Sequence, residues 1–516
     1  MAAKKIMIQG TMSNSGKSFL VAALCRIFRQ DGYRVAPFKS QNMALNSYIT
    51  KDGLEIGRAQ AMQAEAAGIE PTVDMNPILL KPTSQMGSQV IVNGEVAGNW
   101  KAMDYYRRKP EFIPTIQAAF ARLGEEYDVI VLEGAGSPAE INLREHDIVN
   151  MGMAKLAGAP VLLVGDIDRG GVFASLYGTV ALLEPEEQAM IKGLVINKFR
   201  GDPKILEPGL RMIEDKLHIP VVGVIPMEKI DIDDEDSLSE RLTRTGTGRG
   251  KEGQGLDVAV IRLPHISNFT DFNVLERRQG VNVRYVERAD LLGRPDLVIL
   301  PGTKNTMADL GWLRQSGLEP AILRLSQENR VPVIGICGGY QMLGAWLRDP
   351  DGVEGAAGSS MRGMGLLDAE TIFAAQKTRT QITGRLQSES RMFAGSPPRP
   401  LRGYEIHMGF TLQLPSGQEP EQALSSHAAV LLEDGRWDGL ERSDGLVFGT
   451  YLHGLFDNEW LTDVLLGRLA VQKGVKLERE RESTESYKER QYDKLAALVR
   501  GSLDMKQIYA VLERGI

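Results

Sequence analysis

The chain has very few cysteines, no long apolar run and no excess of positive charge. Only Cys25 and Cys337 occur in 516 residues, so the sequence has no disulfide framework and fits a reducing cytoplasm. The longest apolar runs, such as APVLLVG, are far shorter than the ~20 residues of a membrane span. The N-terminus enters a strand without a signal-peptide core. The net charge of −7 gives no support for a nucleic acid or an anionic membrane as partner. We therefore expect a cytoplasmic protein.

Short apolar runs alternate with amphipathic segments in two series, and this alternation predicts an α/β protein with parallel sheets. The first series ends near VVGVIPM and predicts a domain over residues 1–230. An acidic and then glycine-rich stretch predicts a linker over 231–255. The second series predicts a domain over 256–460. Residues 461–516 are charged and helical in pattern, and we expect this C-terminal extension to pack on the second domain.

A glycine-rich loop follows the first strand and opens a helix. It runs from Gly10 to Ser18 and contains Ser15, Gly16 and Lys17. Backbone N–H groups in such a loop face phosphate oxygens, the lysine reaches the β- and γ-phosphates, and the serine hydroxyl ligates Mg²⁺. The sequence therefore predicts an ATP site with Mg²⁺. Five residues separate the two glycines, one more than in the usual phosphate loop, and this longer form resembles the loop of dethiobiotin synthetase.

Two further strand ends are candidates for the same nucleotide site, because ligands of an open α/β sheet collect at the carboxyl ends of its strands. Glu133 ends the strand VIVLE, where its carboxylate can hold Mg²⁺ or simply belong to a turn. Asn197 ends the strand in LVINKF, where its amide can read an adenine or lie in a surface loop. We predict Glu133 as a metal ligand and Asn197 as a nucleotide-binding residue.

Polar residues at other strand ends are candidates for binding the second substrate. The loop FKSQNMALNS carries Gln41 and Asn42, and it suits either a large amide- and carboxylate-bearing ligand or a capping turn. Asp168 and Arg169 follow the strand VLLVGD and can position a substrate. Asp147 lies beyond the Glu133 loop, and we predict that it faces the reacting phosphate.

The stretch VPVIGICGGYQMLG places Cys337 where an apolar strand ends and a helix begins. A lone cysteine in an apolar run is usually a core residue. Here glycines flank it closely, at 335, 338 and 339, as a sharp and crowded nucleophile turn requires. Backbone N–H groups and the helix end then face the sulfur, which favours a thiolate and can hold an oxyanion. We predict Cys337 as a nucleophile.

The nucleophile needs a base, and His453 is the best candidate among the second domain's histidines. It follows the apolar strand VFGTY, so it can lie at the same sheet edge as Cys337 and exchange the thiol proton. Gly302 ends another strand, and we predict that it and Gly338 form the oxyanion hole. The sequence leaves open which residue orients His453. Glu405 in RGYEIHMG is one candidate, and that segment can equally position substrate.

The second half resembles the class I glutamine amidotransferases in the order of its glycine turn, nucleophilic cysteine and late histidine. The resemblance implies a class I amidotransferase-like α/β fold with glutamine as nitrogen donor. Enzymes of that class usually carry a glutamate two residues after the histidine, but this chain has Leu455 there. The absence of this glutamate is a feature of the cobyrinic and cobyric acid amidotransferase branch of this class.

The whole chain resembles the cobyric acid synthase family of cobalamin biosynthesis. The motifs that carry this are GTMSNSGKS, FKSQNMALNS, VLEGAGSPAEINL, DIDRGG, PGTKNT, GICGGYQMLG, RGYEIHMG and YLHGLF, in that order. The resemblance implies ATP- and glutamine-dependent amidation of a corrin, adenosylcobyrinic acid a,c-diamide, at its b, d, e and g carboxylates. One alternative is the sister enzyme, cobyrinic acid a,c-diamide synthase. A less favoured alternative is a partition-type ATPase fused to an inactive amidotransferase-like domain.

Overall fold

The computed structural model describes residues 3–84, 87–233, 255–414, 426–478 and 482–516. They form two compact units. Unit 1 contains residues 1–44, 54–233 and 485–516, and unit 2 contains residues 45–53 and 234–484. Most of the predicted linker, 234–254, lies outside the described residues. None of the described helices combines the length and apolarity needed to cross a bilayer.

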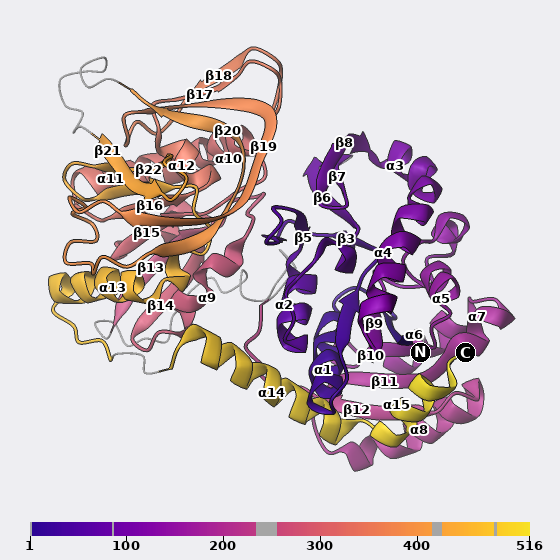
Figure 1. Ribbon diagram of the computed structural model, residues 1–516. Helices are drawn as coiled ribbons and strands as arrows, with labels where there is room; N and C mark the ends of the chain where they lie inside the picture. Colours follow the sequence, from indigo (N-terminus) through magenta and orange to yellow (C-terminus); the bar gives the residue numbers. More distant parts are fainter. Residues whose placement is uncertain (1–2, 85–86, 234–254, 415–425, 479–481) are drawn as a thin grey trace. The chain divides into compact units, whose positions relative to one another are not determined.

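Unit 1 is built on a six-stranded sheet in the order β12-β11-β10-β1-β9-β2 (Figure 1). Every neighbouring pair is parallel, as the alternating sequence pattern predicts. The strands are β1 (Lys4–Gly10), β2 (Val35–Phe38), β9 (Val129–Glu133), β10 (Val161–Asp166), β11 (Ile191–Phe199) and β12 (Val221–Pro226). Because the strands are parallel, Gly10, Glu133 and Asp166 all lie at one edge, where the phosphate loop begins.

Helices cover both faces of this sheet, so the middle of most of its strands is mainly apolar and buried. The helices are α1 (Lys17–Gln30), α2 (Arg58–Ala67), α4 (Ile113–Glu126), α5 (Met151–Ala157), α6 (Val172–Ala181), α7 (Pro185–Met190) and α8 (Pro203–Leu217). One core cluster lies beneath α1, and another includes α4, α5 and α6. Cys25 lies in α1 and is fully buried, which raises the pKa of its thiol far above the ordinary value. It is a core residue.

A second, smaller sheet belongs to unit 1 and has the order β3-β6-β7-β8. Its strands are β3 (Gln41–Met43), β6 (Ile78–Ser84), β7 (Gly87–Val92) and β8 (Glu95–Lys101), and η1 (Val73–Met75) precedes β6. After β8 the chain forms α3 (Ala102–Arg108) and η2 (Lys109–Phe112) before it enters α4. β3 lies within the FKSQNMALNS loop, so this loop is part of a sheet rather than a simple turn.

Unit 2 has a mixed sheet in which β14-β13-β15-β16-β23 are parallel. These are β13 (Leu256–Ile261), β14 (Val281–Val286), β15 (Leu297–Leu300), β16 (Val333–Ile336) and β23 (Val447–Thr450). The sheet continues from β23 through β22 (Trp437–Arg442) and β21 (Ser426–Leu432) to β19 (Ala369–Leu386). Beyond β19 it ends with β17 (Trp346–Asp349) and β18 (Ser359–Arg362), and β20 (Leu401–Gln413) also pairs with β19.

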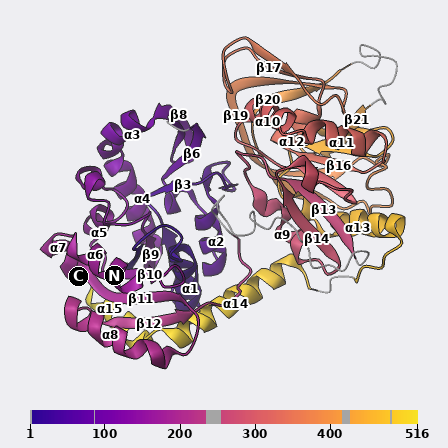
Figure 2. The same ribbon diagram turned by 180° about the vertical axis from the view of Figure 1, so that it is seen from behind.

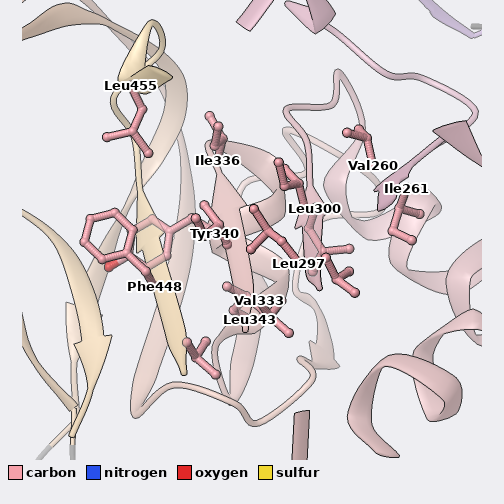
Figure 3. Close-up of a cluster of buried hydrophobic side chains, with 14 of the residues drawn as sticks. Val260, Ile261, Leu297, Leu300, Val333, Ile336, Tyr340, Leu343, Phe448 and Leu455 are labelled. Atoms are coloured by element: carbon pink, nitrogen blue, oxygen red, sulfur yellow. The ribbon is translucent and has the colours of Figure 1, made fainter. Parts of the chain in front are cut away.

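Apolar side chains between the parallel strands and their helices form the core of unit 2. Its α-helices are α9 (Asn273–Arg277), α10 (Thr306–Gln315), α11 (Leu318–Gln327), α12 (Gly338–Leu343) and α13 (Glu459–Lys473), and its short 3₁₀ helices include η4 (Phe269–Phe272) and η6 (Leu455–Asp457). Figure 3 shows Leu300, Ile336 and Phe448 within this core. Ile336 is the last residue of β16, so the core holds the strand end that carries Cys337.

The C-terminal helices correct one expectation. α14 (Thr484–Ser502) and α15 (Met505–Arg514) pack on unit 1 from residue 485 onward, and not on the second domain. Figures 1 and 2 both show α15 beside α8 and β12. Tyr492 and Ile508 enter the core cluster beneath α1, and Arg26 of α1 donates hydrogen bonds to Asp493 and Glu489. Helical periodicity predicts an apolar face but cannot say which sheet that face covers.

A short segment of the first half of the sequence belongs to unit 2. It covers residues 45–53 and includes β4 (Ser47–Ile49), while β5 (Glu55–Gly57) is again in unit 1. Ile49 packs with Tyr404 and Ile406 of β20. A domain boundary near 230 cannot anticipate this excursion, because the segment begins at the end of the FKSQNMALNS motif and lies far from that boundary in the sequence.

Candidate functional site

Cys337 occupies a strained turn between β16 and α12. Its backbone φ is +52°, in the left-handed region that few residues other than glycine adopt. A Cβ on Gly339 would lie 2.0 Å from the carbonyl oxygen of Leu300, and one on Gly335 would lie 2.7 Å from that of Gly339. Both positions therefore require glycine, because neighbouring backbone atoms lie too close for a side chain. The elbow that the sequence predicts is present, and its cysteine is 7% exposed.

His453 follows β23 and lies beside this elbow, fully buried. Its Nδ1 is 2.7 Å from Oδ2 of Asp271, whose Oδ1 accepts the backbone N–H of Gly454 at 3.1 Å. Burial lowers the pKa of His453, but the charge and hydrogen bond of Asp271 and a hydrogen bond with Cys337 together raise it to about 10. Cys337, His453 and Asp271 thus have the geometry of a nucleophile, a base and an orienting carboxylate.

The orienting carboxylate is not the predicted candidate Glu405. Glu405 lies on β20 and accepts hydrogen bonds from Arg436 at 3.1 Å. Its strand neighbours face the catalytic pair instead: the rings of Tyr404 and His453 stack at 5.2 Å, and the carbonyl of Ile406 is 3.4 Å from Cys337 Sγ. Alternate residues of a strand point to opposite faces, so the motif RGYEIHMG supports the site through the residues on either side of Glu405.

Asn268 is a further buried neighbour of the catalytic histidine. It adopts a φ of +52°, and its Oδ1 accepts the backbone N–H of Ser47 at 3.1 Å. Its Nδ2 is 3.4 Å from Nε2 of His453. The Ser47 contact orients the amide so that its nitrogen faces the histidine. The segment 45–53 therefore reaches a residue that touches His453, the predicted base.

The two glycines predicted for the oxyanion hole lie next to the catalytic pair. A Cβ on Gly302 would be 3.1 Å from Cε1 of His453, and one on Gly338 would be 2.6 Å from the side chain of Thr303. The carbonyl of Gly302 accepts the N–H of Ser267 at 2.9 Å. Neither position has room for a side chain, so the backbone itself lines this part of the site. Their role as oxyanion donors remains a prediction.

The phosphate loop in unit 1 fits a nucleotide. Gly16 has a φ of +96°, and a Cβ there would lie 2.0 Å from Nδ2 of Asn197. That amide donates to the carbonyl of Ser15 at 2.9 Å, so Asn197 supports the loop backbone. The buried hydroxyls of Thr11 and Ser15 have no hydrogen-bond partner among the described residues. Unpaired buried donors on such a loop suit the oxygens of a bound phosphate group.

Lys17 and Glu133 lie at the same sheet edge as the loop. Lys17 Nζ donates to the carbonyls of Met12 and Gly136 at 2.9 and 3.1 Å. Glu133 accepts from Ser18 Oγ at 2.9 Å, Lys39 Nζ at 2.7 Å and Gln63 Nε2 at 2.5 Å. Burial raises the pKa of Glu133, but the charge and hydrogen bond of Lys39, the hydrogen bond of Gln63 and the charge of Lys17 outweigh it and lower the pKa.

These contacts match the usual way in which proteins hold Mg²⁺ beside a nucleotide. Such a site supplies one or two protein oxygens and leaves the other positions to water and phosphate. The Ser18 hydroxyl and the ionised Glu133 carboxylate, 2.9 Å apart, are such a pair. No group of three or more His, Cys, Asp or Glu side chains that could hold a metal occurs in the described part of the chain. A metal here therefore depends on the nucleotide for most of its ligands.

The predicted substrate residues fall into two groups. Gln41 accepts a hydrogen bond from Tyr105 at 2.6 Å, and Asn42 donates to Gln60 at 3.0 Å, so both are held in defined positions. Asp168 instead pairs with the exposed Arg200 at 2.8 Å, and Arg169 is largely exposed. Their binding roles remain predictions.

Asp147 has a structural task in the described fold. Its carboxylate accepts the backbone N–H groups of Val149, Asn150 and Gly152 at 2.8–2.9 Å, at the start of α5. Aspartate side chains commonly accept backbone N–H groups of the residues that follow them in turns. Its predicted role at the reacting phosphate stays a prediction.

Sequence reasoning missed three residues that contact the predicted site residues. Asp271 lies 182 positions before His453, and Asn268 is three residues earlier, in the motif HISNFTDF. Gln63 is on α2 and reaches Glu133 from there. The dense polar and aromatic composition of HISNFTDF was a usable signal, but no spacing rule links it to a histidine so distant in sequence.

Comparisons with known proteins agree with this two-site arrangement. Residues 6–238 match the CobQ/CobB/MinD/ParA nucleotide binding domain, and residues 257–460 match the CobB/CobQ-like glutamine amidotransferase domain. A relative from Lachnoclostridium phytofermentans, named cobyric acid synthase, is 57% identical over the full length of both chains.

Further relatives of the same name give the same result. The one from Ruminiclostridium cellulolyticum is 55% identical and covers 100% of this chain and 98% of the relative. The one from Alkaliphilus metalliredigens is 51% identical over 98% of this chain and 99% of the relative. Since the likeness spans both units and their sites, the chain belongs to the cobyric acid synthase family and is a glutamine amidotransferase with a nucleotide-binding domain.

Proposed function

We propose that this enzyme converts adenosylcobyrinic acid a,c-diamide to adenosylcobyric acid by amidating the b, d, e and g carboxylates, with ATP and glutamine as co-substrates. The observation that carries the proposal is the buried Cys337–His453–Asp271 arrangement in a chain that also holds the Lys17–Glu133 phosphate site. One site suits release of ammonia, and the other suits activation of a carboxylate. The family relationship supplies the corrin.

At the first site, His453 takes the thiol proton and Cys337 Sγ attacks the amide carbon of glutamine. The C–N bond breaks, His453 returns the proton to the leaving nitrogen, and ammonia departs from a thioester. Water activated by the same histidine then hydrolyses the thioester to glutamate and frees the thiol. Asp271 holds the ring orientation and stabilises the imidazolium through both steps. Gly302 and Gly338 offer backbone N–H groups to the oxyanion.

At the second site, a carboxylate oxygen of the corrin attacks the γ-phosphorus of ATP, and ADP leaves. The product is an acyl phosphate, whose carbonyl carbon ammonia attacks; the C–N bond forms, inorganic phosphate leaves and a proton is lost. Mg²⁺ bound by Ser18 and Glu133 would neutralise charge on the phosphates. Lys17 would stabilise the transferring phosphoryl group, for which its ammonium must leave the carbonyls of Met12 and Gly136.

The direct test is mass spectrometry of the corrin after incubation with enzyme, ATP, Mg²⁺ and glutamine. Each amidation replaces –OH by –NH2, so the mass change counts the amide groups formed, and ¹⁵N-amide glutamine identifies their source. We expect amidation of the a,c-diamide at all of the proposed positions. Conversion of cobyrinic acid only to its a,c-diamide would instead identify the sister enzyme, and absence of any amidation would refute the proposal.

The Cys337→Ser variant separates the two sites. We expect it to lose glutamine-dependent amidation while added ammonia still supports amidation, because only ammonia release requires the thiol. Loss of both activities in a folded variant would contradict the two-site scheme.

A further inference from the structure

The segment that follows β8 packs closely on the functional edge of unit 1. Its aromatic side chains form a cluster: Phe112 stacks on Trp100 and on Tyr105, each with ring centroids 5.8 Å apart. Arg108 lies over the Trp100 ring at 4.1 Å. The cluster gives α3 and η2 a fixed position, since aromatic pairs of this geometry add to the burial of their surface.

Two contacts attach this segment to the loops that carry Gln41 and Asp147, and a third joins these loops to each other. Tyr105 donates to Gln41 at 2.6 Å, and the rings of Tyr106 and His146 lie 4.9 Å apart. Between the two loops, Ser40 donates to the carbonyl of Ile148 at 2.6 Å. The residues that follow α3 are therefore held at the carboxyl edge of the sheet, next to loops 40–42 and 146–148.

Lys109 is the first residue of η2 and lies at this junction. The residue is 9% exposed, and its ammonium has no hydrogen bond or ion pair within the described ranges. Unit 1 has three other lysines that are equally buried, and each has partners. Lys39 pairs with Glu133 at 2.7 Å, Lys81 pairs with Glu55 at 2.8 Å, and Lys17 donates to two carbonyls.

The nearest charge does not serve as a partner for Lys109. Burial lowers the pKa of Lys109, and the negative charge of Asp147 acts against this. The Asp147 carboxylate, however, is not within ion-pair distance and already accepts three backbone N–H groups. A largely desolvated ammonium without a counter-ion is unfavourable, so an anion that arrives with a ligand would gain from contact with it.

Asp147, whose charge acts on Lys109, is connected to the phosphate site by a short series of contacts. Asp147 accepts the N–H of Asn150, and the Asn150 amide exchanges two hydrogen bonds with the backbone of Ala135. The next residue, Gly136, accepts a hydrogen bond from Lys17. The unpaired ammonium thus belongs to the same edge of unit 1 as the group predicted to stabilise phosphoryl transfer.

We propose that Lys109 binds a carboxylate of the polycarboxylate corrin substrate and positions the corrin beside the phosphate loop. This inference rests on the proposed function, which supplies the class of substrate. The fixed α3–η2 segment holds the ammonium in place, so little conformational entropy is lost on binding. A charge-assisted hydrogen bond of this kind corresponds to about a ten- to hundredfold effect on affinity.

The test compares Lys109→Met with Lys109→Arg and with the control Lys101→Met. Lys101 ends β8 in the same segment and is exposed. Corrin binding is measured by equilibrium dialysis, followed by the absorbance of the corrin. Amidation with ammonia as nitrogen source gives the KM values for corrin and ATP. We expect Lys109→Met to raise the corrin Kd and KM about ten- to hundredfold, with unchanged KM for ATP and unchanged glutamine hydrolysis.

Two further measurements separate substrate binding from a structural role. A corrin whose carboxylates are esterified should bind the wild type and Lys109→Met equally, because the contact requires a carboxylate. Lys109→Met should keep or raise the melting temperature, since it removes an unpaired buried charge. Lys109→Arg should retain part of the corrin affinity.

Several results would overturn the inference. They are unchanged corrin affinity in Lys109→Met, an equal loss in Lys101→Met, or weaker binding of ATP in place of corrin. A wild-type enzyme that binds the corrin but does not amidate it would refute the proposed function and leave the role of Lys109 standing.

Discussion

Replacing Asp271 by asparagine is the most direct test of how the glutamine site works. The asparagine keeps the size of the side chain but removes its charge. It can no longer accept hydrogen bonds with both ends, as Asp271 does from His453 Nδ1 at 2.7 Å and from the N–H of Gly454 at 3.1 Å. If its amide group turns toward Nδ1, the histidine ring must change its tautomer and present a proton to Cys337 where a base is needed.

The size of the effect follows from the pKa of His453. A value of about 10, against 6.5 for an ordinary histidine, corresponds to about 5 kcal/mol of preference for the charged ring. Asp271 makes the two largest contributions that raise this pKa, and Cys337 makes the rest. The same change costs about 10⁴-fold in Ser-His-Asp hydrolases. A thiol is a better nucleophile than a hydroxyl and depends less on its base, so we expect a loss of about 10²–10³-fold.

The assay measures glutamine hydrolysis and, separately, amidation with ammonia. We expect Asp271→Asn to lower kcat for glutamine hydrolysis and to leave ammonia-dependent amidation unchanged. Asp257→Asn is a matched control. Asp257 also lies in unit 2 and pairs with Arg284 at 2.8 Å, but it stands at the opposite end of the parallel strands from the elbow. This control should hydrolyse glutamine at close to the wild-type rate.

A loss of less than about threefold in Asp271→Asn would show that the carboxylate does not position His453, since even one ordinary hydrogen bond contributes more. Equal losses in the control and in Asp271→Asn would point to a general effect on folding. A parallel fall in ammonia-dependent amidation would mean that the two activities are not separable in the way the geometry indicates.

The remaining predictions concern the phosphate loop, a buried carboxyl group and the C-terminal helices. Lys17→Met should lower amidation at least about 10³-fold with glutamine and with ammonia alike, because it removes a charge from the phosphoryl site; retained ammonia-dependent activity would contradict that role. Burial and Asp438 raise the pKa of Glu405 to about 7, despite Arg436. The folded protein then retains a proton that the unfolded chain releases between pH 4.5 and 7, so stability falls as pH rises through that range. Glu405→Gln should therefore gain up to about 3 kcal/mol over the wild type between pH 5 and pH 8 in denaturation experiments, and a constant difference would refute this. Ile508→Ala should destabilise unit 1 by about 2–5 kcal/mol and lower the melting transition that a nucleotide analogue protects, whereas Leu461→Ala in α13 should lower the other transition.

The local chemistry of each site can be read from the sequence. The glycines around Cys337 are spaced as only a crowded turn requires, and the left-handed φ of +52° confirms that turn. The apolar strands that precede the phosphate loop and Glu133 predict a parallel sheet, and parallel strands bring their ends to one edge whatever the rest of the fold does. Contacts between near neighbours in sequence depend on few degrees of freedom, so short motifs specify them.

Only the tertiary structure decides which distant residues complete these sites. Asp271 and Glu405 are both plausible partners for His453 by composition, and the pleat of β20 turns Glu405 toward Arg436 while η4 brings Asp271 to the ring. In the same way, an amphipathic pattern predicts α14 and α15, but the pairing of Arg26 with Asp493 and the apolar cluster under α1 place them on unit 1. Lys109 shows the same division. A lysine indicates a charge, but only packing reveals that this side chain is largely buried and that its ammonium has no partner among the described residues, because burial and pairing depend on every element that surrounds it.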